Sequence, residues 1–419
     1  MPRTRDEIEA PDGFPIDHWL QLCRLAQDQP GRIREMLGDD SAEPIYLGKG
    51  LAHLQSLAMY QRRLRSRVAR KFEDAESWLW TEGLLQLASD AQAASHCAGY
   101  FPTNARVIDV GCGGGADAIA LLRRGPVVAV DRDALPLALT AANASLQLDI
   151  SGSTSPSLEL IQTDAEKLQF DREDLLHLDP DRRGEGGQRS VQLRWHSPDE
   201  ATLSKLIRES RGGSIKLAPG CRDSPPEGLE NVSLQWVGVD RGVVQQRWWW
   251  GVAGFPVGGR RVSALLGPDW HHFDVPADRW QEAVQGRLAD VVTEDAPEPG
   301  SWLGDGDPTL RAAECQGVYA AERGYQLLGN EMGYFCSRSP IDDPLVRWFR
   351  LVEAVPLDAR KLRRLVQGLG CDGILLKTRN VRSVPEPLVK WSAKPAKRPA
   401  VVMATAFGGR HWALVVEPA

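Results

Sequence analysis

The chain has 419 residues, more than one hydrophobic core usually organises, so two or three domains are expected. Charged residues make up 25% and hydrophobic residues 42% of the sequence, as in ordinary folded proteins. The first thirty residues lack the apolar run of a signal peptide, and no later window offers about 18 consecutive uncharged apolar residues. A cytoplasmic location without a membrane partner is expected. The seven cysteines form no C-x-x-C pair and the eight histidines are dispersed, so no metal site is predicted.

The net charge of −6 is unevenly distributed. Residues 350–419 hold thirteen Lys and Arg against five Asp and Glu, a net charge of +8, which leaves −14 for the rest of the chain. A basic segment joined to an acidic body favours a polyanionic substrate such as nucleic acid. The alternative is a solvated basic face without a partner. Clustering of the charges in one terminal segment favours the first interpretation.

Residues 1–98 have the pattern of amphipathic helices, one beginning near Asp17 and another covering 51–72. Six Lys and Arg crowd the end of the second helix, where they either reach phosphates or form an ordinary charged face. Thr81 is a suitable N-cap for a further short helix that would pack against the following domain.

The segment 106–131 is the most informative part of the sequence. It predicts a strand at 107–110, a glycine turn, a helix at 116–124 and a second strand that ends in a carboxylate, Asp131. Glycines let the backbone turn sharply and approach a ligand, while the helix aims its free amides at the same point. A carboxylate at the end of the second strand can accept hydrogen bonds from both ribose hydroxyls. The segment therefore predicts a nucleoside pocket.

Two features favour S-adenosylmethionine over a nicotinamide dinucleotide in this pocket. Asp109 stands two residues before the first glycine, where its charge would oppose a pyrophosphate and could hold the amino end of a methionine group. His177-Leu178-Asp179-Pro180 predicts a strand ending in an Asp-Pro turn, which dehydrogenases generally do not need. Gly111-x-Gly113-x-x-Ala116 also matches a dinucleotide fingerprint. A nicotinamide enzyme and a purely structural glycine turn therefore remain alternative interpretations.

Strands and helices alternate after residue 106 as a parallel sheet requires. Further strands are expected at 158–162, 175–178 and 214–217, and further helices at 135–146 and 199–211. Three later segments predict antiparallel strands that close one edge: 232–237, 243–250 and 261–266. The run Trp248-Trp249-Trp250 could be a base-stacking platform. Packing on both sides of the sheet is favoured, because consecutive strand residues cannot share one face.

Residues 294–300 have the composition of a linker. Beyond them, the pattern predicts a smaller mixed domain, with a helix at 308–323, a hairpin around Gly329-Asn330, and a final hairpin that turns at 406–410. Between these lie a strand at 348–353, a helix at 358–369 and a strand at 373–377.

Several short motifs follow one another in a fixed order from about Trp80 to the C-terminus. They are Thr81-Glu-Gly-Leu-Leu-Gln86, Asp109-Val-Gly-Cys-Gly-Gly-Gly-Ala-Asp117, Asp179-Pro-Asp-Arg-Arg183, Ile215-Lys-Leu-Ala-Pro-Gly220, Ser339-Pro340, Trp348-Phe-Arg350 and Leu376-Lys-Thr-Arg379. In this order they resemble bacterial class I S-adenosylmethionine-dependent methyltransferases that carry a C-terminal THUMP-like domain.

The resemblance implies an α/β fold: a Rossmann-like class I methyltransferase domain with a mostly parallel sheet and an antiparallel edge. An N-terminal helical region precedes it at 1–98, and the methyltransferase domain itself covers 99–268. A linker at 269–300 leads to an α+β THUMP-like domain at 301–419, similar to the RNA-binding modules of tRNA-modifying enzymes. The chain departs from the family at Asp181, where relatives have a small residue, and at Leu376-Lys-Thr-Arg379, which is less basic than a Lys-Lys-Arg version.

The resemblance also implies roles for individual residues. The methionine portion of the cofactor would be held by Asp109 and by the turn glycines Gly111, Gly113 and Gly115. The ribose would be held by Asp131 and the adenine amino group by Asp164. Because the positive sulfonium already activates its methyl group, the protein mainly supplies position and orientation.

The catalytic turn would be Asp179-Pro180, where the methyl group emerges. In amino-methyltransferases a related Asp/Asn-Pro-Pro-aromatic turn holds the target amino group and stacks its base. Here Asp181, Arg182 and Arg183 replace the second proline and the aromatic residue, so N-methylation is only weakly favoured. Arg182 and Arg183 would instead contact substrate phosphate, and the alternative is that they pair with Asp181 or Glu185. Lys216 would either neutralise substrate charge or end its strand.

We therefore expect a methyltransferase that acts on a nucleotide of structured RNA, either tRNA or rRNA. The alternative is a catalytically weak or inactive RNA-binding protein that retains the fold as a scaffold. A small-molecule methyltransferase is disfavoured by the basic C-terminal segment.

Overall fold

The computed structural model describes residues 11–38, 51–148, 157–182, 190–229, 231–286, 289–330, 332–339 and 342–418. The chain forms two compact units. The first comprises residues 1–232 and 244–254, and the second comprises residues 233–243 and 255–419. None of the helices in these ranges is long and apolar enough to cross a membrane.

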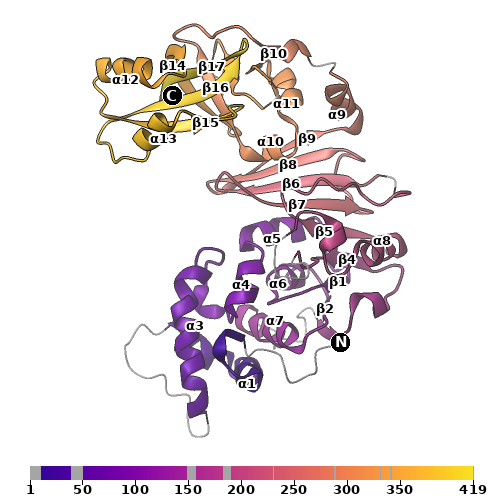
Figure 1. Ribbon diagram of the computed structural model, residues 1–419. Helices are drawn as coiled ribbons and strands as arrows, with labels where there is room; N and C mark the ends of the chain where they lie inside the picture. Colours follow the sequence, from indigo (N-terminus) through magenta and orange to yellow (C-terminus); the bar gives the residue numbers. More distant parts are fainter. Residues whose placement is uncertain are drawn as a thin grey trace. The chain divides into compact units, whose positions relative to one another are not determined.

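The first unit is built on a sheet whose strands follow the order β3-β2-β1-β4-β5-β7 (Figure 1). Strands β1 (Val107–Val110), β2 (Val127–Asp131), β3 (Leu158–Gln162), β4 (Leu175–Leu178) and β5 (Gly212–Leu217) run parallel. Strand β7 (Gly242–Trp250) pairs antiparallel with β5. The connection reverses direction between β1 and β4, which is the place where such sheets bind ligands. The predicted Rossmann-like sheet with an antiparallel edge is confirmed.

Four helices belong to the same unit as this sheet: α5 (Ala91–Ala98), α6 (Ala116–Leu122), α7 (Ala134–Gln147) and α8 (Glu200–Glu209). The N-terminal helices α1 (Ile16–Asp28), α2 (Pro30–Gly38) and α3 (Gln55–Val68) share one apolar core with α7. The guanidinium of Arg34 in α2 donates a 2.8 Å hydrogen bond to the carbonyl oxygen of Leu146. The predicted helical region thus belongs to the same compact unit as the sheet.

The short helix α4 (Glu82–Leu87) begins as predicted, because the Thr81 hydroxyl accepts a 3.1 Å hydrogen bond from the amide of Leu84. The three tryptophans at the end of β7 are all buried, each with at most 6% of its surface exposed. They therefore pack inside the unit and offer no base-stacking platform, as the sequence favoured.

The second unit begins earlier than the sequence predicts. Strand β6 (Ser233–Val239) pairs parallel with β8 (Arg260–Leu266), which pairs antiparallel with β9 (Asp269–Val275). The sequence predicts that β6 and β8 belong to an antiparallel set. This prediction is wrong, because β7 lies between the two strands in the sequence and β8 runs in the same direction as β6. The segment predicted as a linker contains β9 and helix α9 (Ala277–Val284). Their apolar side chains pack in one hydrophobic core with side chains of β6 and β8.

Helices α10 (Pro308–Ala312) and α11 (Gln316–Arg323) complete this core. The sequence predicts them as one helix. The backbone breaks between them at Glu314, whose φ of 55° lies in the left-handed region.

The second unit also contains an eight-stranded sheet with the order β10-β12-β13-β11-β14-β17-β16-β15. Its central strands are β11 (Trp302–Gly306), β14 (Val346–Pro356), β17 (Arg410–Pro418) and β16 (Pro399–Phe407), all antiparallel. The shorter strands are β10 (Val292–Thr293), β12 (Gln326–Leu328), β13 (Phe335–Ser337) and β15 (Gly373–Thr378). Helices α12 (Ala359–Gly368) and α13 (Glu386–Ser392) pack near β14 and β15, as Figure 1 shows. The predicted α+β character of the C-terminal region is confirmed.

Candidate active site

The glycine turn after β1 is in direct contact with the Asp-Pro turn after β4. Gly111 has a φ of +83°, and a Cβ on it would lie 2.6 Å from the carbonyl oxygen of Asp179. The amide of Asp179 donates a 3.0 Å hydrogen bond to the carbonyl oxygen of Val110. Only glycine fits this approach. The two motifs that the sequence singled out therefore meet at the carboxyl edge of the sheet.

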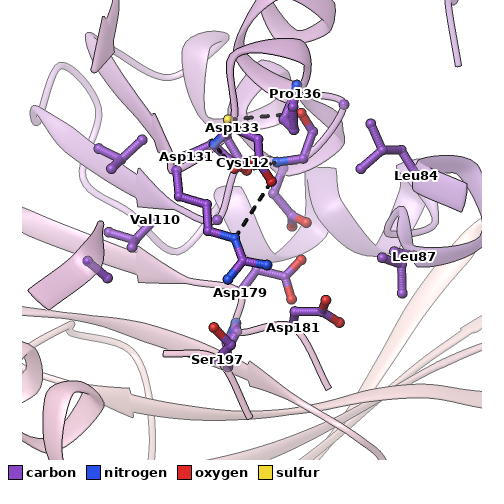
Figure 2. Close-up of a pocket in the computed structure, with 18 of the residues that line it drawn as sticks. Leu84, Leu87, Val110, Cys112, Asp131, Asp133, Pro136, Asp179, Asp181 and Ser197 are labelled. Carbon is purple, nitrogen blue, oxygen red and sulfur yellow. Dashed lines mark hydrogen bonds and ion pairs between the residues drawn. The ribbon is translucent and has the colours of Figure 1, made fainter. Parts of the chain in front are cut away.

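A cavity of about 310 Å³ opens at this edge (Figure 2). Figure 2 shows Leu84 and Leu87 of α4 on one side of the cavity and Val110 at the end of β1 on the other. Asp131 lies toward one end of the cavity, and Asp179 lies toward the other. The volume falls in the range of small-ligand sites.

Most of the predicted cofactor residues lie in the wall of this cavity: Gly111, Gly113, Asp131 and Asp164. The Asp131 carboxylate accepts hydrogen bonds from the amides of Gly113, at 3.3 Å, and Asp133, at 3.1 Å, which fix its orientation. Burial raises the pKa of Asp131. Asp164 is exposed and pairs with Lys167 at 3.2 Å.

Two predicted cofactor residues lie behind the wall. Gly115 is the N-cap of α6, with a φ of +91°, and packs against Thr140. Asp109 is completely buried. Within the described ranges neither of its carboxylate oxygens has a hydrogen-bond partner, and Nε2 of His177 lies 4.0 Å away. Burial, together with the charges of Asp117 and Asp179, raises the pKa of Asp109 well above its ordinary value.

Sequence reasoning missed the residues that cover the cavity. Trp80, Leu84, Leu87 and Ser89 all line it. The Trp80 ring lies against the glycine turn so closely that a Cβ on Gly114 would lie 2.1 Å from it. A signal was present, because the motif beginning at Thr81 directly precedes the fold, but its apolar residues look like ordinary packing.

Two of the basic residues at the end of α3 hold this cover in place. The Lys71 ammonium donates hydrogen bonds to the carbonyl oxygens of Leu85, at 2.8 Å, and Ala88, at 2.6 Å, and so caps the end of α4. Arg67 pairs with Glu82 at the start of α4, at 2.7 Å. These two residues of the charged cluster therefore have structural contacts within the protein.

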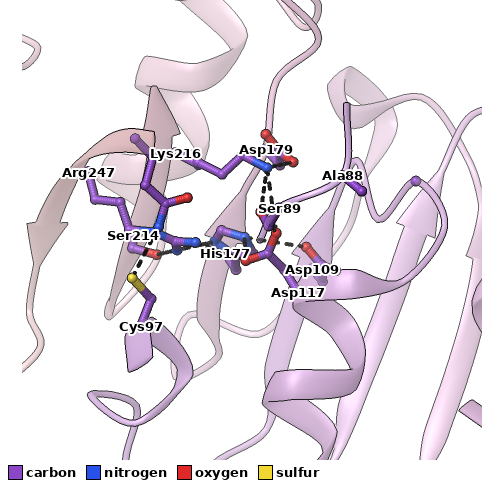
Figure 3. Close-up of polar contacts among 12 residues, drawn as sticks. Ala88, Ser89, Cys97, Asp109, Asp117, His177, Asp179, Ser214, Lys216 and Arg247 are labelled. Carbon is purple, nitrogen blue, oxygen red and sulfur yellow. Dashed lines mark hydrogen bonds and ion pairs between the residues drawn. The ribbon is translucent and has the colours of Figure 1, made fainter. Parts of the chain in front are cut away.

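A buried polar network lies behind the Asp179-Pro180 turn (Figure 3). Lys216, on β5 and only 5% exposed, forms an ion pair with Asp179. The same ammonium donates a 2.8 Å hydrogen bond to Ser89 and lies 3.5 Å from Asp117. The Ser89 hydroxyl in turn donates to Asp117 at 2.5 Å. Lys216 therefore neutralises carboxylates of the protein itself and is absent from the wall of the cavity.

Arg247 of β7, the cross-strand partner of Lys216, belongs to the same network, as Figure 3 shows. Its guanidinium, 1% exposed, donates to Asp117 at 2.9 Å and to the Ser214 hydroxyl at 3.1 Å. Although burial acts to raise it, the charges of Lys216 and Arg247 and the nearby His177 hold the pKa of Asp117 well below its usual range. Asp117 is therefore an anion held between two cations.

His177 is a neutral member of the same network. Burial and the charge of Arg247 lower the pKa of His177. A guanidinium nitrogen of Arg247 lies 3.3 Å from Nδ1, and since a guanidinium can only donate, Nδ1 accepts. The proton of His177 is thus assigned to Nε2, which faces Asp117 at 3.5 Å.

Only some of the predicted catalytic and substrate-binding residues lie in the cavity wall. Asp179, Pro180 and Arg182 line the cavity. Arg183 lies outside the described residues. Lys216 is turned to Asp179, so neither predicted role for it, neutralising substrate or ending a strand, describes its contacts.

The charge of the cavity discriminates between ligands. Among the residues in its wall, seven are Asp or Glu and two are Arg: Asp117, Asp131, Asp133, Asp164, Glu166, Asp179, Asp181, Arg132 and Arg182. The Asp117 carboxylate also occupies the first turn of α6, where a dinucleotide would place its pyrophosphate, although Lys216 and Arg247 compensate its charge. A cationic ligand such as a sulfonium is favoured here, and a pyrophosphate is opposed.

Comparisons with known proteins agree with this geometry. The THUMP domain-like family matches residues 346–418. An uncharacterized S-adenosylmethionine-dependent methyltransferase of Mycobacterium tuberculosis, from strains CDC 1551 and H37Rv, is 27% identical over 361 residues, which cover 82% of this chain and 91% of the relative. The crystal structure of a protein assigned as a methyltransferase, from Porphyromonas gingivalis W83, aligns with a TM-score of 0.72 and 17% identity over 96% of this chain and 98% of its own.

The predicted enzyme class and cofactor agree with these relatives, and the predicted resemblance is confirmed. The chain is a relative of S-adenosylmethionine-dependent methyltransferases, shares the fold of the Porphyromonas gingivalis protein over nearly its whole length, and has a THUMP domain-like segment at its C-terminal end.

Proposed function

We propose that this protein transfers a methyl group from S-adenosylmethionine to a nucleotide of structured RNA. The observation that carries the proposal is the acidic cavity in which the glycine turn and the Asp179-Pro180 turn meet. The RNA part of the proposal is supported by the THUMP domain-like segment and by the basic charge around it.

The residues present fit this cofactor. Asp131, fixed by two backbone amides, would accept the ribose hydroxyls, and Gly113 would pass beneath the ligand, since no atom other than a Leu84 methyl lies within 4 Å of its Cβ position. Leu84, Leu87 and Trp80 would exclude water from one side. The bound cofactor supplies an electrophilic methyl group, and the chain contributes position and charge.

Asp179 would receive the target group of the RNA. Its carboxylate lines the cavity and is held from behind by Lys216, so it is oriented to accept a hydrogen bond from an amino or hydroxyl group of a nucleotide. Arg182, in the same wall, would contact the adjoining phosphate. Both roles can be separated from cofactor binding by substitution.

Some basic side chains of the C-terminal unit form ion pairs within the protein. Lys377 and Arg379, from the motif that resembles the family, pair with Asp305 of β11 at 2.7 and 3.0 Å. Helix α12 instead presents Lys361, Arg363 and Arg364 on its exposed side. We therefore assign RNA binding to the exposed side of α12 and no direct contact to the Lys377-Thr378-Arg379 motif.

The first test is calorimetric titration of the full chain with S-adenosylhomocysteine, followed by transfer of tritiated methyl groups from S-adenosylmethionine to RNA purified from cells that lack the gene. Saturable binding and RNA labelling are the expected results. Binding without labelling of any RNA would favour the alternative of an inactive RNA-binding protein, and a folded protein that binds no cofactor analogue would contradict the proposal.

The second test concerns the C-terminal unit. Truncation at residue 301 would cut through the core shared by β8, β9, α10 and α11, so charge substitutions are the better tool. Changing Lys361, Arg363 and Arg364 to Glu should weaken RNA binding and reduce its salt dependence. The matched control changes the exposed Arg172, Lys205 and Arg208 of the first unit, with the same change in net charge. Equal loss in both variants would contradict a dedicated surface on α12.

A further inference from the structure

The segment that follows the Asp179-Pro180 turn carries an unusual aromatic residue on a rigid frame. Asp181 and Ser197 exchange two backbone hydrogen bonds, of 2.8 and 2.9 Å. The amide of Ser190 donates to the carbonyl oxygen of Arg182 at 2.8 Å, and the amide of Leu193 donates to the Asp223 carboxylate at 2.5 Å. Because both ends of residues 190–197 are bonded to Asp181 and Arg182, directly after the Asp179-Pro180 turn, this segment forms a fixed rim of the cavity.

The rest of the segment is anchored by burial. Leu193 is 3% exposed and His196 is 5% exposed, and Ser197 and Pro198 line the cavity itself. Between these anchors stands Trp195, with 56% of its surface exposed. It is the only exposed Trp, Tyr or Phe in the described parts of the chain. An indole that is held in place and half-exposed beside a cavity is preorganised to stack on a planar ligand.

Trp195 lies close in the chain to the wall of the cavity. One residue, His196, lies between it and Ser197 of the cavity wall, so its Cα lies at most about 7.6 Å from that of Ser197. The guanidinium of Arg194 stands over the indole ring, 5.4 Å from its centroid, which places positive charge next to the aromatic surface. Indole and guanidinium together match a nucleotide, whose base stacks on a ring and whose phosphate pairs with a cation.

We propose that Trp195 is the base-stacking residue of the RNA site and supplies from the 190–197 segment the aromatic surface that the Asp179-Pro180 turn lacks. This inference rests on the proposed function in one respect, namely that the substrate is a nucleic acid. Trp195 binds a nucleobase next to the cavity by its face, while Asp179 receives the target group. The side chain contributes to substrate binding and has no part in holding the cofactor.

The test compares Trp195→Ala and Trp195→Phe with Leu160→Ala, a control that removes another exposed apolar side chain, on β3 of the same unit. The probe is a fluorescently labelled 12-nucleotide single-stranded RNA, measured by anisotropy with the full chain saturated with S-adenosylhomocysteine. Stacking on an aromatic ring predicts binding about 5- to 150-fold weaker for Trp195→Ala. Trp195→Phe should retain most of the affinity and Leu160→Ala all of it.

Salt dependence supplies a readout that a structural role would not give. Loss of stacking should lower the affinity of Trp195→Ala without changing the slope of affinity against salt, because no phosphate contact is removed. Wild-type affinity in Trp195→Ala, an equal loss in Leu160→Ala, a parallel loss of S-adenosylhomocysteine binding, or no binding of the probe by the wild type would each overturn the inference.

The methyl-transfer assay separates this inference from the proposed function. If the wild type labels RNA and Trp195→Ala does so with an unchanged KM, the function stands and the stacking role fails. If the wild type labels no RNA but binding of the probe depends on Trp195, the stacking role stands and the methyltransferase proposal fails.

Discussion

Lys216 offers the sharpest test of how the candidate site is held together. Its ammonium lies behind the cavity wall and joins three residues of that wall, Asp179, Ser89 and Asp117. Replacing Lys216 by Met keeps the length and apolar stem of the side chain and removes only the charge. Asp117 retains Arg247 at 2.9 Å, whereas Asp179 loses the only cation with which the described residues pair it.

The cost of this change follows from burial. Removing one partner of a buried ion pair usually costs about 3–5 kcal/mol, because a charge is left without compensation. The Asp179 side chain is 23% exposed, so solvent from the cavity compensates part of the loss and about 3 kcal/mol is expected. For a folding unit of about 150–250 residues this corresponds to a fall in Tm of about 6–12 °C.

Lys216→Met should lower the rate of methyl transfer more than it lowers the affinity for S-adenosylhomocysteine. Lys216 does not line the cavity, so the affinity for S-adenosylhomocysteine should change little. A carboxylate displaced by about 1 Å from the target group can cost about 10²-fold in rate, and methyl transfer should fall by about that factor. The exposed Lys205→Met on α8 is the control and should shift stability by less than about 0.5 kcal/mol.

A double-mutant cycle decides whether the pair is the cause. Lys216→Met, Asp179→Asn and the double variant are compared by denaturant unfolding and by methyl transfer. The double variant should be more stable than the sum of the single losses predicts, because it leaves no unpaired charge. Single losses that add within about 0.5 kcal/mol would refute the reasoning.

Three further changes test the rest of the site. Asp131→Ala should weaken S-adenosylhomocysteine binding by about 10- to 100-fold through loss of charge-assisted hydrogen bonds; unchanged affinity in calorimetry would mean that the ribose is held elsewhere. Arg182→Ala should lower RNA methylation more than cofactor affinity, and equal losses would point to a structural role. The buried Asp109 carboxyl has a pKa well above its ordinary value of 3.8, so the folded protein holds a proton that the unfolded chain releases. This contribution to stability is complete below about pH 3.8 and is lost as the pH rises. Asp109→Asn should therefore raise Tm more at pH 8 than at pH 5, and a pH-independent effect would contradict burial as the cause.

The parts of the site that lie close together in the sequence could be predicted. Strand β1, the glycine turn, α6 and β2 form one continuous segment, and Asp131 is at its end, so spacing alone determines where the carboxylate lies. The contact between Gly111 and Asp179 also follows from the order of parallel strands, because the carboxyl ends of β1 and β4 share one edge.

The contacts of the buried charged residues could not be predicted, because their partners lie far away in the sequence. Lys216 and Asp179 are separated by 37 residues, and Arg247 and Asp117 by 130. A lysine on an apolar strand looks the same in the sequence whether it faces a substrate or a carboxylate of its own protein. The division between units likewise failed at 269–300, because the apolar residues of β9 and α9 join a core completed by α10 and α11, far along the chain.

The sequence by itself determined the class of fold and predicted the place of the cavity, since both follow from periodicity and from contiguous motifs. Only the tertiary structure decided which charges are available to a ligand. It placed Lys71 on the end of α4, Lys216 on Asp179 and Lys377 on Asp305, and it left Trp195 exposed beside the cavity. The physical reason is that burial and ion pairing depend on which surfaces meet when the chain folds, and residues distant in the sequence determine those surfaces.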